Sequence, residues 1–144
     1  MLAKNLAAEK EAFPYIASCG PEIDEVPVGD PLAVFWLDEI KALALDAVHD
    51  EMREIVRPHL PSGRLNSMNP GSGAATLWPL QEQKPLFHLI GEEAQKWVGV
   101  KLTDTCLMHP NKSVSGMFFF GAEDFVSCAY CDRLDCIGRR AMRL

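Results

Sequence analysis

The stretch formed by residues 102–120 constrains the fold of this chain more than any other. Residues 109–112 contain proline, which fixes φ, and asparagine, which bonds to its own backbone, so they predict a turn. Residues 113–116 are small, and residues 117–120 then form an unbroken apolar run that ends at Gly121. Such a run predicts a buried strand, and the small residues before it can present backbone N–H and C=O groups to a ligand. An ordinary strand–turn–strand in a core is the alternative explanation.

The composition bounds the class of protein. The chain has 144 residues, 48% of them hydrophobic, which is the size and apolar content of one domain with its own core. The net charge of −6 argues against a nucleic-acid partner, because a basic surface is needed to displace counterions from phosphates. No apolar run reaches the roughly 18 residues of a membrane helix. Since Glu9, Lys10 and Glu11 interrupt the N-terminal segment, we expect no signal peptide and a cytoplasmic protein without a membrane partner.

A long helix is predicted between Asp30 and Pro58. Asp30 is an N-cap acceptor followed by proline, and Pro58 ends the helix. His49 is expected on the polar side, in solvent. The apolar face is defined by residues spaced three or four apart: Ala33, Leu37, Ile40, Ala44, Val48, Met52 and Ile55. We expect this helix, about 40 Å long, to be the main wall of the core. Further apolar residues widen the face enough to cover a sheet or to meet a second subunit as a homodimer: Phe35, Trp36 and Leu43.

Shorter elements complete the pattern. Strands are predicted at 13–20, 64–68, 98–103 and 117–120, and residues 125–127 are expected to pair back on 117–120 as a hairpin. Helical segments are predicted at 3–11, 78–90 and 92–97, with a kink or a new start at Pro85. This order predicts an α+β domain with a mainly antiparallel sheet covered by helices, including one long helix at about 31–57. We expect two parts: a domain formed by residues 1–127 and a cysteine-bearing tail formed by residues 128–144.

Several motifs resemble the activation domain of cobalamin-dependent methionine synthase. The sequences Leu-Thr-Asp-Thr at 102–105, Met-His-Pro at 108–110 and Ser-Val-Ser-Gly at 113–116 are similar to the family pattern of L-T-E-S, M-x-P and S-V-S-G followed by aromatic residues. A second similar block spans residues 64–87. The resemblance covers most of the chain and is strongest to small stand-alone relatives that accompany corrinoid methyl-transfer systems. It implies a fold like that of the activation domain, shortened at its N-terminus.

The resemblance also implies a function. In this family, a cobalamin that has slipped into the inactive cob(II) state is restored by one-electron reduction, and a methyl group from S-adenosylmethionine traps the product. The chain would then bind S-adenosylmethionine and dock on a corrinoid-binding protein or methyltransferase. Cobalamin would reach it only through that partner. Whether the chain itself turns over a substrate is a question that the sequence leaves open.

Two blocks of residues form the predicted cofactor site. An arginine can grip the carboxylate of a ligand with two hydrogen bonds, and a Pro-Gly pair lets the backbone approach a ligand closely. A carboxylate would suit the sulfonium cation. Ser72 stands where the family has tyrosine, so the alternative is a surface arginine beside an ordinary turn. The predicted cofactor-binding residues are Arg64, Pro70, Gly71, Asp104, Ser113, Val114, Ser115 and Gly116.

Three thiols lie within nine residues of the tail, at Cys128, Cys131 and Cys136. Neighbouring arginines favour thiolates, and thiolates at this spacing suit zinc or an iron–sulfur cluster. Cys106 is the natural fourth ligand if the tail folds back over it, and Cys19, His109 or a residue of a second subunit are the other candidates. Redox-active thiols and inert residues are the alternatives. The second hypothesis for the function follows from this motif: a non-catalytic metal- or iron–sulfur-binding scaffold that has lost the S-adenosylmethionine site.

Overall fold

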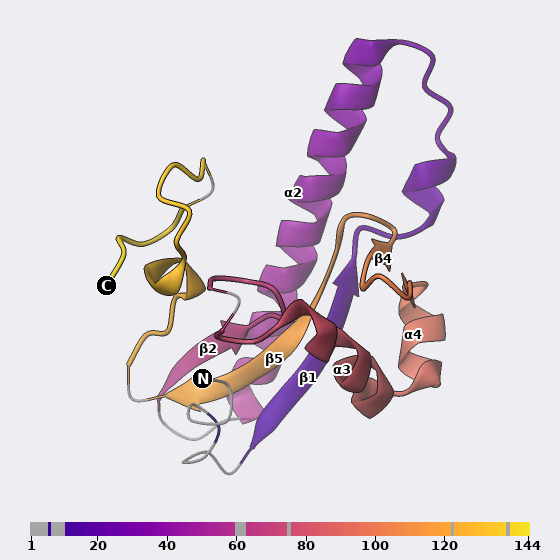
Figure 1. Ribbon diagram of the computed structural model, residues 1–144. Helices are drawn as coiled ribbons and strands as arrows, with labels where there is room; N and C mark the ends of the chain where they lie inside the picture. Colours follow the sequence, from indigo (N-terminus) through magenta and orange to yellow (C-terminus); the bar gives the residue numbers. More distant parts are fainter. Residues whose placement is uncertain (1–5, 7–10, 60–62, 75, 122, 138) are drawn as a thin grey trace.

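The fold is α+β and is built on a small antiparallel sheet (Figure 1). Strand β5 (Ser113–Gly121) lies between β1 (Ala12–Ser18) and β2 (Arg64–Met68), and both pairings are antiparallel. A second sheet pairs β3 (Lys101–Leu102) with β4 (Met108–His109). The predicted fold class is therefore confirmed. The computed structural model describes residues 6, 11–59, 63–74, 76–121, 123–137 and 139–144.

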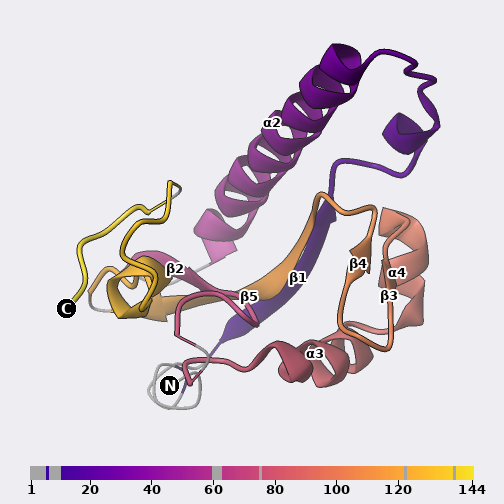
Figure 2. The same ribbon diagram turned by 45° about the horizontal axis from the view of Figure 1, so that its top comes forward.

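Helices cover both faces of the sheet. Helix α2 lies on one face, and α3 and α4 lie on the other, as the two views of Figures 1 and 2 show. None of the helices in the described part of the chain is long and apolar enough to cross a membrane. The helical elements are η1 (Glu22–Glu25), α2 (Pro31–Val56), η2 (Arg57–His59), η3 (Leu80–Glu82), α3 (Gln83–Ile90), α4 (Glu92–Val98) and η4 (Ser127–Tyr130).

Strand β5 is the central strand, and its residues 115–120 are all buried. Because a central strand that is covered on both faces has no solvent side, a continuous apolar run is what its position requires. The predicted hairpin with residues 125–127 is wrong, since β1 and β2 already occupy both edges of β5. The backbone N–H of Phe125 instead donates to Oδ1 of Asn66 at 2.8 Å, and its ring stacks on Tyr130.

The hydrophobic core lies on the α3 side of the sheet. A cluster of buried side chains joins β2 and β5 to the segment before α3 and to α3 itself: Met68, Leu77, Trp78, Leu86, Met117 and Phe119. A second cluster continues it toward α4, with Ile16, Phe87 and Val100. This face carries most of the buried apolar area, and burial of that area is the main favourable term in folding.

Helix α2 begins and ends near the predicted residues but does not form the main wall of the core. Oδ2 of Asp30 accepts from the backbone N–H of Ala33 at 3.0 Å, which confirms the N-cap. None of the helix's residues, all of which the structure describes, is buried. Its C-terminal half packs on the sheet, and its N-terminal half projects past the sheet's end (Figure 2). The prediction of a core wall is therefore wrong, because the sheet is shorter than the helix.

The contact between α2 and the sheet is partly polar. The guanidinium of Arg53 donates to the backbone carbonyl of Leu65 at 2.8 Å and lies 5.9 Å above the ring of Phe118. His49 is half-buried, with its ring 5.4 Å from that of Phe118. The expectation of a solvated His49 is wrong, since the face that α2 turns to the sheet includes this histidine.

Candidate functional site

A cavity of about 380 Å³ opens between the loop after β2, the start of α3 and the segment that joins β4 to β5. Its volume lies within the range of roughly 300–1,000 Å³ that is usual for small-molecule sites. Four of the predicted cofactor-binding residues line it: Pro70, Ser113, Val114 and Ser115. The two blocks of sequence that carried the resemblance therefore share one cavity. The remaining lining residues are Asn69, Leu80, Gln83, Cys106, Leu107, Met108, His109 and Asn111.

Close packing around Gly116 fixes the loop against the strand. The amide of Asn69 donates to the backbone carbonyl of Ser115 at 2.8 Å and to the hydroxyl of Tyr15 at 2.7 Å. A Cβ on Gly116 would lie 2.5 Å from both Nδ2 of Asn69 and the backbone oxygen of Met68. Only glycine allows this approach. Gly116 is thus placed behind the cavity wall, where it lets Asn69 reach the strand.

Among the described residues, Gln83 carries a buried side-chain acceptor without a hydrogen-bond partner, and this residue lines the cavity. Its side chain is 3% exposed, and Nε2 donates to Oγ of Ser115 at 3.1 Å. Its carbonyl oxygen Oε1 has no hydrogen-bond partner among the described residues. An unpaired buried acceptor costs about 1–3 kcal/mol, which a donor that reached this oxygen would recover. Sequence patterns did not point to Gln83, since a glutamine in the first turn of a helix normally faces solvent.

The turn between β3 and β4 forms the opposite side of the cavity. The hydroxyl of Thr103 accepts from the backbone N–H of Leu107 at 2.9 Å, and the backbone oxygen of Thr103 accepts from Cys106 at 3.0 Å. Cys106 is buried with φ of 63°, in the left-handed region that residues other than glycine seldom adopt. These contacts hold the turn closed, so that Leu107 and Met108 face Leu80 across the cavity.

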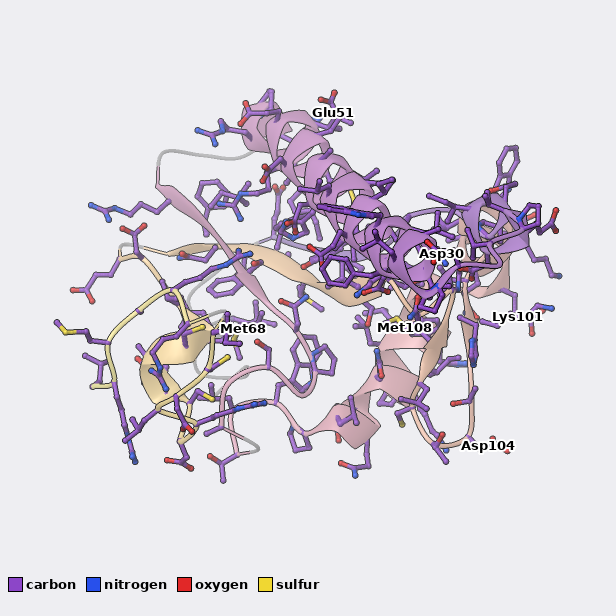
Figure 3. All side chains as sticks on the ribbon, turned by 90° about the horizontal axis from the view of Figure 1, so that it is seen from above. Asp30, Glu51, Met68, Lys101, Asp104 and Met108 are labelled. Carbon is purple, nitrogen blue, oxygen red and sulfur yellow. The ribbon has the colours of Figure 1, made fainter. Side chains whose placement is uncertain are left out.

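Arg64 and Asp104 are placed away from the cavity. Arg64 is at the far end of β2, opposite Gly121, and forms an exposed ion pair with Asp124. Asp104 is exposed in the β3–β4 turn and lines a separate pocket of about 470 Å³ beside α3 and α4. Figure 3 shows Asp104 at the periphery of the molecule, far from Met68 at the end of β2. Gly71 follows the lining residue Pro70, and its N–H donates to the backbone of Trp78 at 2.9 Å.

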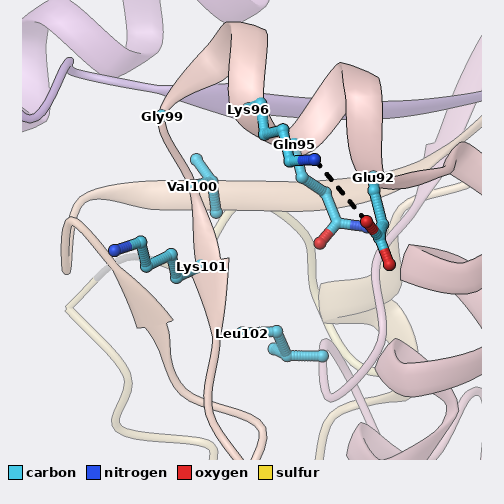
Figure 4. A pocket seen from close by; sticks show the side chains of 7 residues that line it. All are labelled: Glu92, Gln95, Lys96, Gly99, Val100, Lys101 and Leu102. Atoms are coloured by element: carbon cyan, nitrogen blue, oxygen red, sulfur yellow. Dashed lines mark ion pairs between the residues drawn. The ribbon is translucent and has the colours of Figure 1, made fainter.

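A further pocket of about 600 Å³ runs along α4 and β3 (Figure 4). Its polar lining includes an ion pair between Glu92 and Lys96 at 3.6 Å, whose side chains are 88% and 75% exposed. Such exposed pairs contribute little free energy. None of the predicted site residues lines this pocket. Size alone therefore does not identify the site, and the buried acceptor of Gln83 distinguishes the smaller cavity.

Hydrogen bonds connect the cavity wall to α2. Burial raises the pKa of Tyr15 to about 12, with the hydrogen bond from Asn69 opposing that shift. The phenol stays neutral, and its oxygen lies 3.1 Å from Nε2 of His49. Burial also lowers the pKa of His49, and the positive charge of Arg53 lowers it further. The neutral imidazole can accept the phenol's hydrogen, which extends the network from Asn69 to the helix.

The thiols do not come together. Cys106 lies in the turn between β3 and β4, whereas the tail lies beside β2 at the opposite end of the sheet (Figures 1 and 2). All five cysteines are free. In the described part of the chain, no group of three or more His, Cys, Asp or Glu side chains is positioned to hold a metal ion. The predicted ligand set of Cys106, Cys128, Cys131 and Cys136 therefore has no structural support.

Arg139 organises the tail in place of a metal. Its guanidinium donates to the backbone carbonyls of Cys128 at 2.8 Å and Cys131 at 2.9 Å. It also donates to those of Arg133 at 2.6 Å and Ala141 at 3.1 Å. One cation thus gathers four acceptors, and the backbone curves around it. This curvature is set by the carbonyl groups and leaves the thiols unassembled.

The residues around the cavity fall within a stretch that matches a known family. The family model described as vitamin B12 dependent methionine synthase, activation domain, matches residues 47–130. The chain belongs to this family. The matched stretch of this activation-domain protein contains every residue that lines the cavity and ends before Cys131. No curated protein and no solved structure matches the chain.

Membership confirms the resemblance on which the function was predicted. The family connects this activation-domain protein with the reactivation of cobalamin-dependent methionine synthase. The match includes the last ten residues of α2, from residue 47, together with β2, α3, α4 and β5. The part that packs around the cavity is therefore the part that the family shares, whereas β1 and the N-terminal half of α2 lie outside the match.

Proposed function

We propose that this chain binds S-adenosylmethionine in the cavity between the Asn69 loop and β5, and that it acts as an accessory protein in corrinoid-dependent methyl transfer. Family membership supports the cobalamin context. The observation that carries the ligand proposal is the carbonyl oxygen of Gln83, which is buried on the cavity wall without a partner among the described residues. A ligand with an N–H group would complete it.

The lining of the cavity suits parts of this ligand. The acceptor of Gln83 matches an amino group, as on adenine or on the amino-acid portion. Leu80, Leu107 and Met108 offer an apolar surface for a ring. With Arg64 engaged elsewhere, the ligand carboxylate would rely on neutral donors, and His109 or Asn111 at the cavity rim can supply them. When bound, S-adenosylmethionine supplies the methyl group; this chain's residues bind and orient it.

Calorimetric titration with S-adenosylmethionine tests the ligand proposal. Gln83→Met keeps the volume of the side chain and removes the open acceptor, and we expect it to weaken binding by about 10- to 100-fold. Gln81→Met is the matched control, because this glutamine is exposed and does not line the cavity. We expect Arg64→Ala to bind like the native protein, since Arg64 lies outside the cavity.

Two results would overturn the ligand proposal. The first is a folded native protein that binds no S-adenosylmethionine at millimolar concentration. The second is binding that Arg64→Ala abolishes and Gln83→Met leaves unchanged, which would place the site at the other end of β2. Circular dichroism of each variant separates a loss of binding from a loss of fold.

The proposal extends to partners and to the division of the chain. The expected partner is a corrinoid-binding protein or methyltransferase, which brings the cobalamin. Residues 1–127 would form the binding domain, and residues 128–144 the tail that closes around Arg139. The rival hypothesis, a metal- or iron–sulfur-binding scaffold, rests on cysteine spacing alone and stays a prediction. Burial, and then the charge of Asp24, raise the pKa of Cys19, which disfavours the thiolate form that a fourth ligand would need.

A further inference from the structure

An exposed apolar stripe runs along α2, mostly over the half that projects past the sheet. The stripe is formed by Leu32, Trp36, Ile40, Leu43 and Ala47, spaced four, four, three and four residues apart. At 100° per residue these side chains fall in one arc, on the side opposite His49 and Met52. They are exposed, with Leu43 at 68% and Trp36 at 57%. Figure 3 shows the helix along its length, from Asp30 to Glu51.

We propose that this stripe is the interface with a second copy of the chain, in which the two α2 helices pair antiparallel about a two-fold axis at Ile40. The spacing is nearly symmetric about that residue. Leu32 of one copy would meet Ala47 of the other, and Trp36 would meet Leu43. Each pairing sets a larger side chain against a smaller one, as interlocking helices require. A two-fold interface needs this self-complementarity.

The charges on the same face select the antiparallel arrangement. Asp50, Glu51 and Glu54 follow the stripe toward the C-terminal end of α2, and all three are exposed. Parallel helices would bring these carboxylates against their own copies, which costs free energy. Antiparallel helices place the two acidic groups at opposite ends of the pair. The stripe itself, between Leu32 and Ala47, carries no charge on its central line.

The available area is sufficient for a specific dimer. From Leu32 to Ala47 the helix rises about 22 Å. Pairing over this length buries on the order of 1,000 Å² in total, which is the lower bound for a specific interface. Trp36 of one copy would pack on Leu43 of the other, and buried aromatic and aliphatic pairs of this kind dominate binding energy. We therefore expect a dissociation constant in the micromolar range, about 1–10 μM.

A second copy fits the stripe better than the corrinoid partner does. The family model matches residues 47–130, so four of the five stripe residues precede the match. The stripe therefore lies mostly outside the stretch that the family model matches. The stripe residues are also exposed, whereas α2 contacts the sheet through His49 and Arg53.

Light scattering coupled to size-exclusion chromatography tests the dimer at concentrations from about 1 to 100 μM, which span the expected dissociation constant. Ile40→Glu puts two carboxylates at the axis and is expected to raise the dissociation constant by about 100-fold or more. Ile55→Glu is the matched control, since Ile55 is exposed to a similar degree, 58% against 52%, and lies off the stripe. Circular dichroism confirms that both variants keep their helix.

Cross-linking tests the orientation. Under the antiparallel arrangement, Ile40→Cys forms a disulfide with its copy on mild oxidation, whereas Leu32→Cys does not, because its copy lies about 22 Å away along the helix. The native protein, with its five free cysteines, is the blank. A native protein that stays monomeric at 100 μM, a dimer unaffected by Ile40→Glu, or equal cross-linking of both cysteine variants would overturn the proposal.

Discussion

The cavity wall and the C-terminal tail treat a buried polar side chain in opposite ways. In the tail, the guanidinium of Arg139 donates to four backbone carbonyls of its own segment, and only its Nε lacks a partner among the described residues. On the cavity wall, Gln83 makes one bond and leaves its acceptor open. Hydrogen bonds within the chain hold the tail, whereas the unpartnered oxygen of Gln83 is the observation on which the proposed ligand site rests.

Disrupting the packing of the cavity wall should cause the largest loss in the free energy of unfolding. Gly116→Ala places a Cβ at 2.5 Å from the Asn69 amide and from the backbone oxygen of Met68. Because backbone cannot move aside cheaply, we expect a loss of about 3 kcal/mol or more in the free energy of unfolding. Urea denaturation followed by circular dichroism measures it.

Gly29→Ala is the control for this variant. A Cβ at Gly29 meets nothing within 4 Å, so its free energy of unfolding should stay within about 0.5 kcal/mol of the native value. Equal denaturation midpoints for Gly116→Ala and the native protein would show that the loop is not held against β5 as described.

Removing the hydrogen bonds of Arg139 in the tail should lower the free energy of unfolding less and should open only this segment. Arg139→Lys keeps the charge but cannot span four acceptors with a planar fork. We expect the segment to open, with maleimide labelling of Cys128, Cys131 and Cys136 about 10-fold faster and the free energy of unfolding lowered by about 1–2 kcal/mol. Mass spectrometry of timed labelling reactions measures the rates.

Arg140→Lys serves as the control, because the exposed Arg140 makes none of these four bonds. Unchanged labelling in Arg139→Lys would contradict a tail closed by this residue. Stoichiometric zinc or iron in anaerobically purified protein would also contradict it. Such a result would show that the thiols gather around a metal, and the contrast with the cavity wall would disappear.

The hydrogen bond that links the cavity wall to α2 through His49 should have the smallest effect on the free energy of unfolding. Its pKa is lowered by burial and then by Arg53, so the unfolded chain binds a proton more readily than the folded one. Above about pH 7 His49 is neutral in both states and does not destabilise the fold. As the pH falls through the ordinary histidine pKa near 6.5 toward the lowered pKa of His49, the free energy of unfolding decreases. Thermal unfolding between pH 5 and 8 measures the loss.

His49→Gln removes the titrating group and keeps a polar side chain on the same face. In this variant the part of the pH dependence between about pH 5 and 7 should be weaker than in the native protein. Identical slopes for the two proteins in that window would show that His49 is solvated, as the helical pattern alone predicts, and that the network from Asn69 ends at Tyr15.

The sequence predicted the elements better than their contacts. The N-cap at Asp30 and the apolar run in β5 were correct because each depends on a few neighbouring residues. The two blocks around Pro70 and Ser113 were found by resemblance, and the fold does bring them to one cavity. Arg64 was grouped with them because the second similar block begins at this residue, but a five-residue strand, β2, carries it to the other end of the sheet.

Contacts between distant elements were not predicted from the sequence. The side of α2 that faces the sheet is set by where the strands end, so His49 was assigned to solvent and the helix to the core. Gln83 was missed because nothing in its helix marks it as buried; the burial comes from Ser115 and its neighbours on β5, 32 residues away.

By itself, the sequence determined the class of fold, the ends of the long helix and the central strand, because these follow from local backbone preferences and the spacing of apolar residues. Only the tertiary structure decided which polar groups are paired. Hydrogen bonds across the sheet satisfy Asn69 and Tyr15 and leave the acceptor of Gln83 open. Such pairing depends on distances between segments far apart in the chain, and residue spacing alone does not determine those distances.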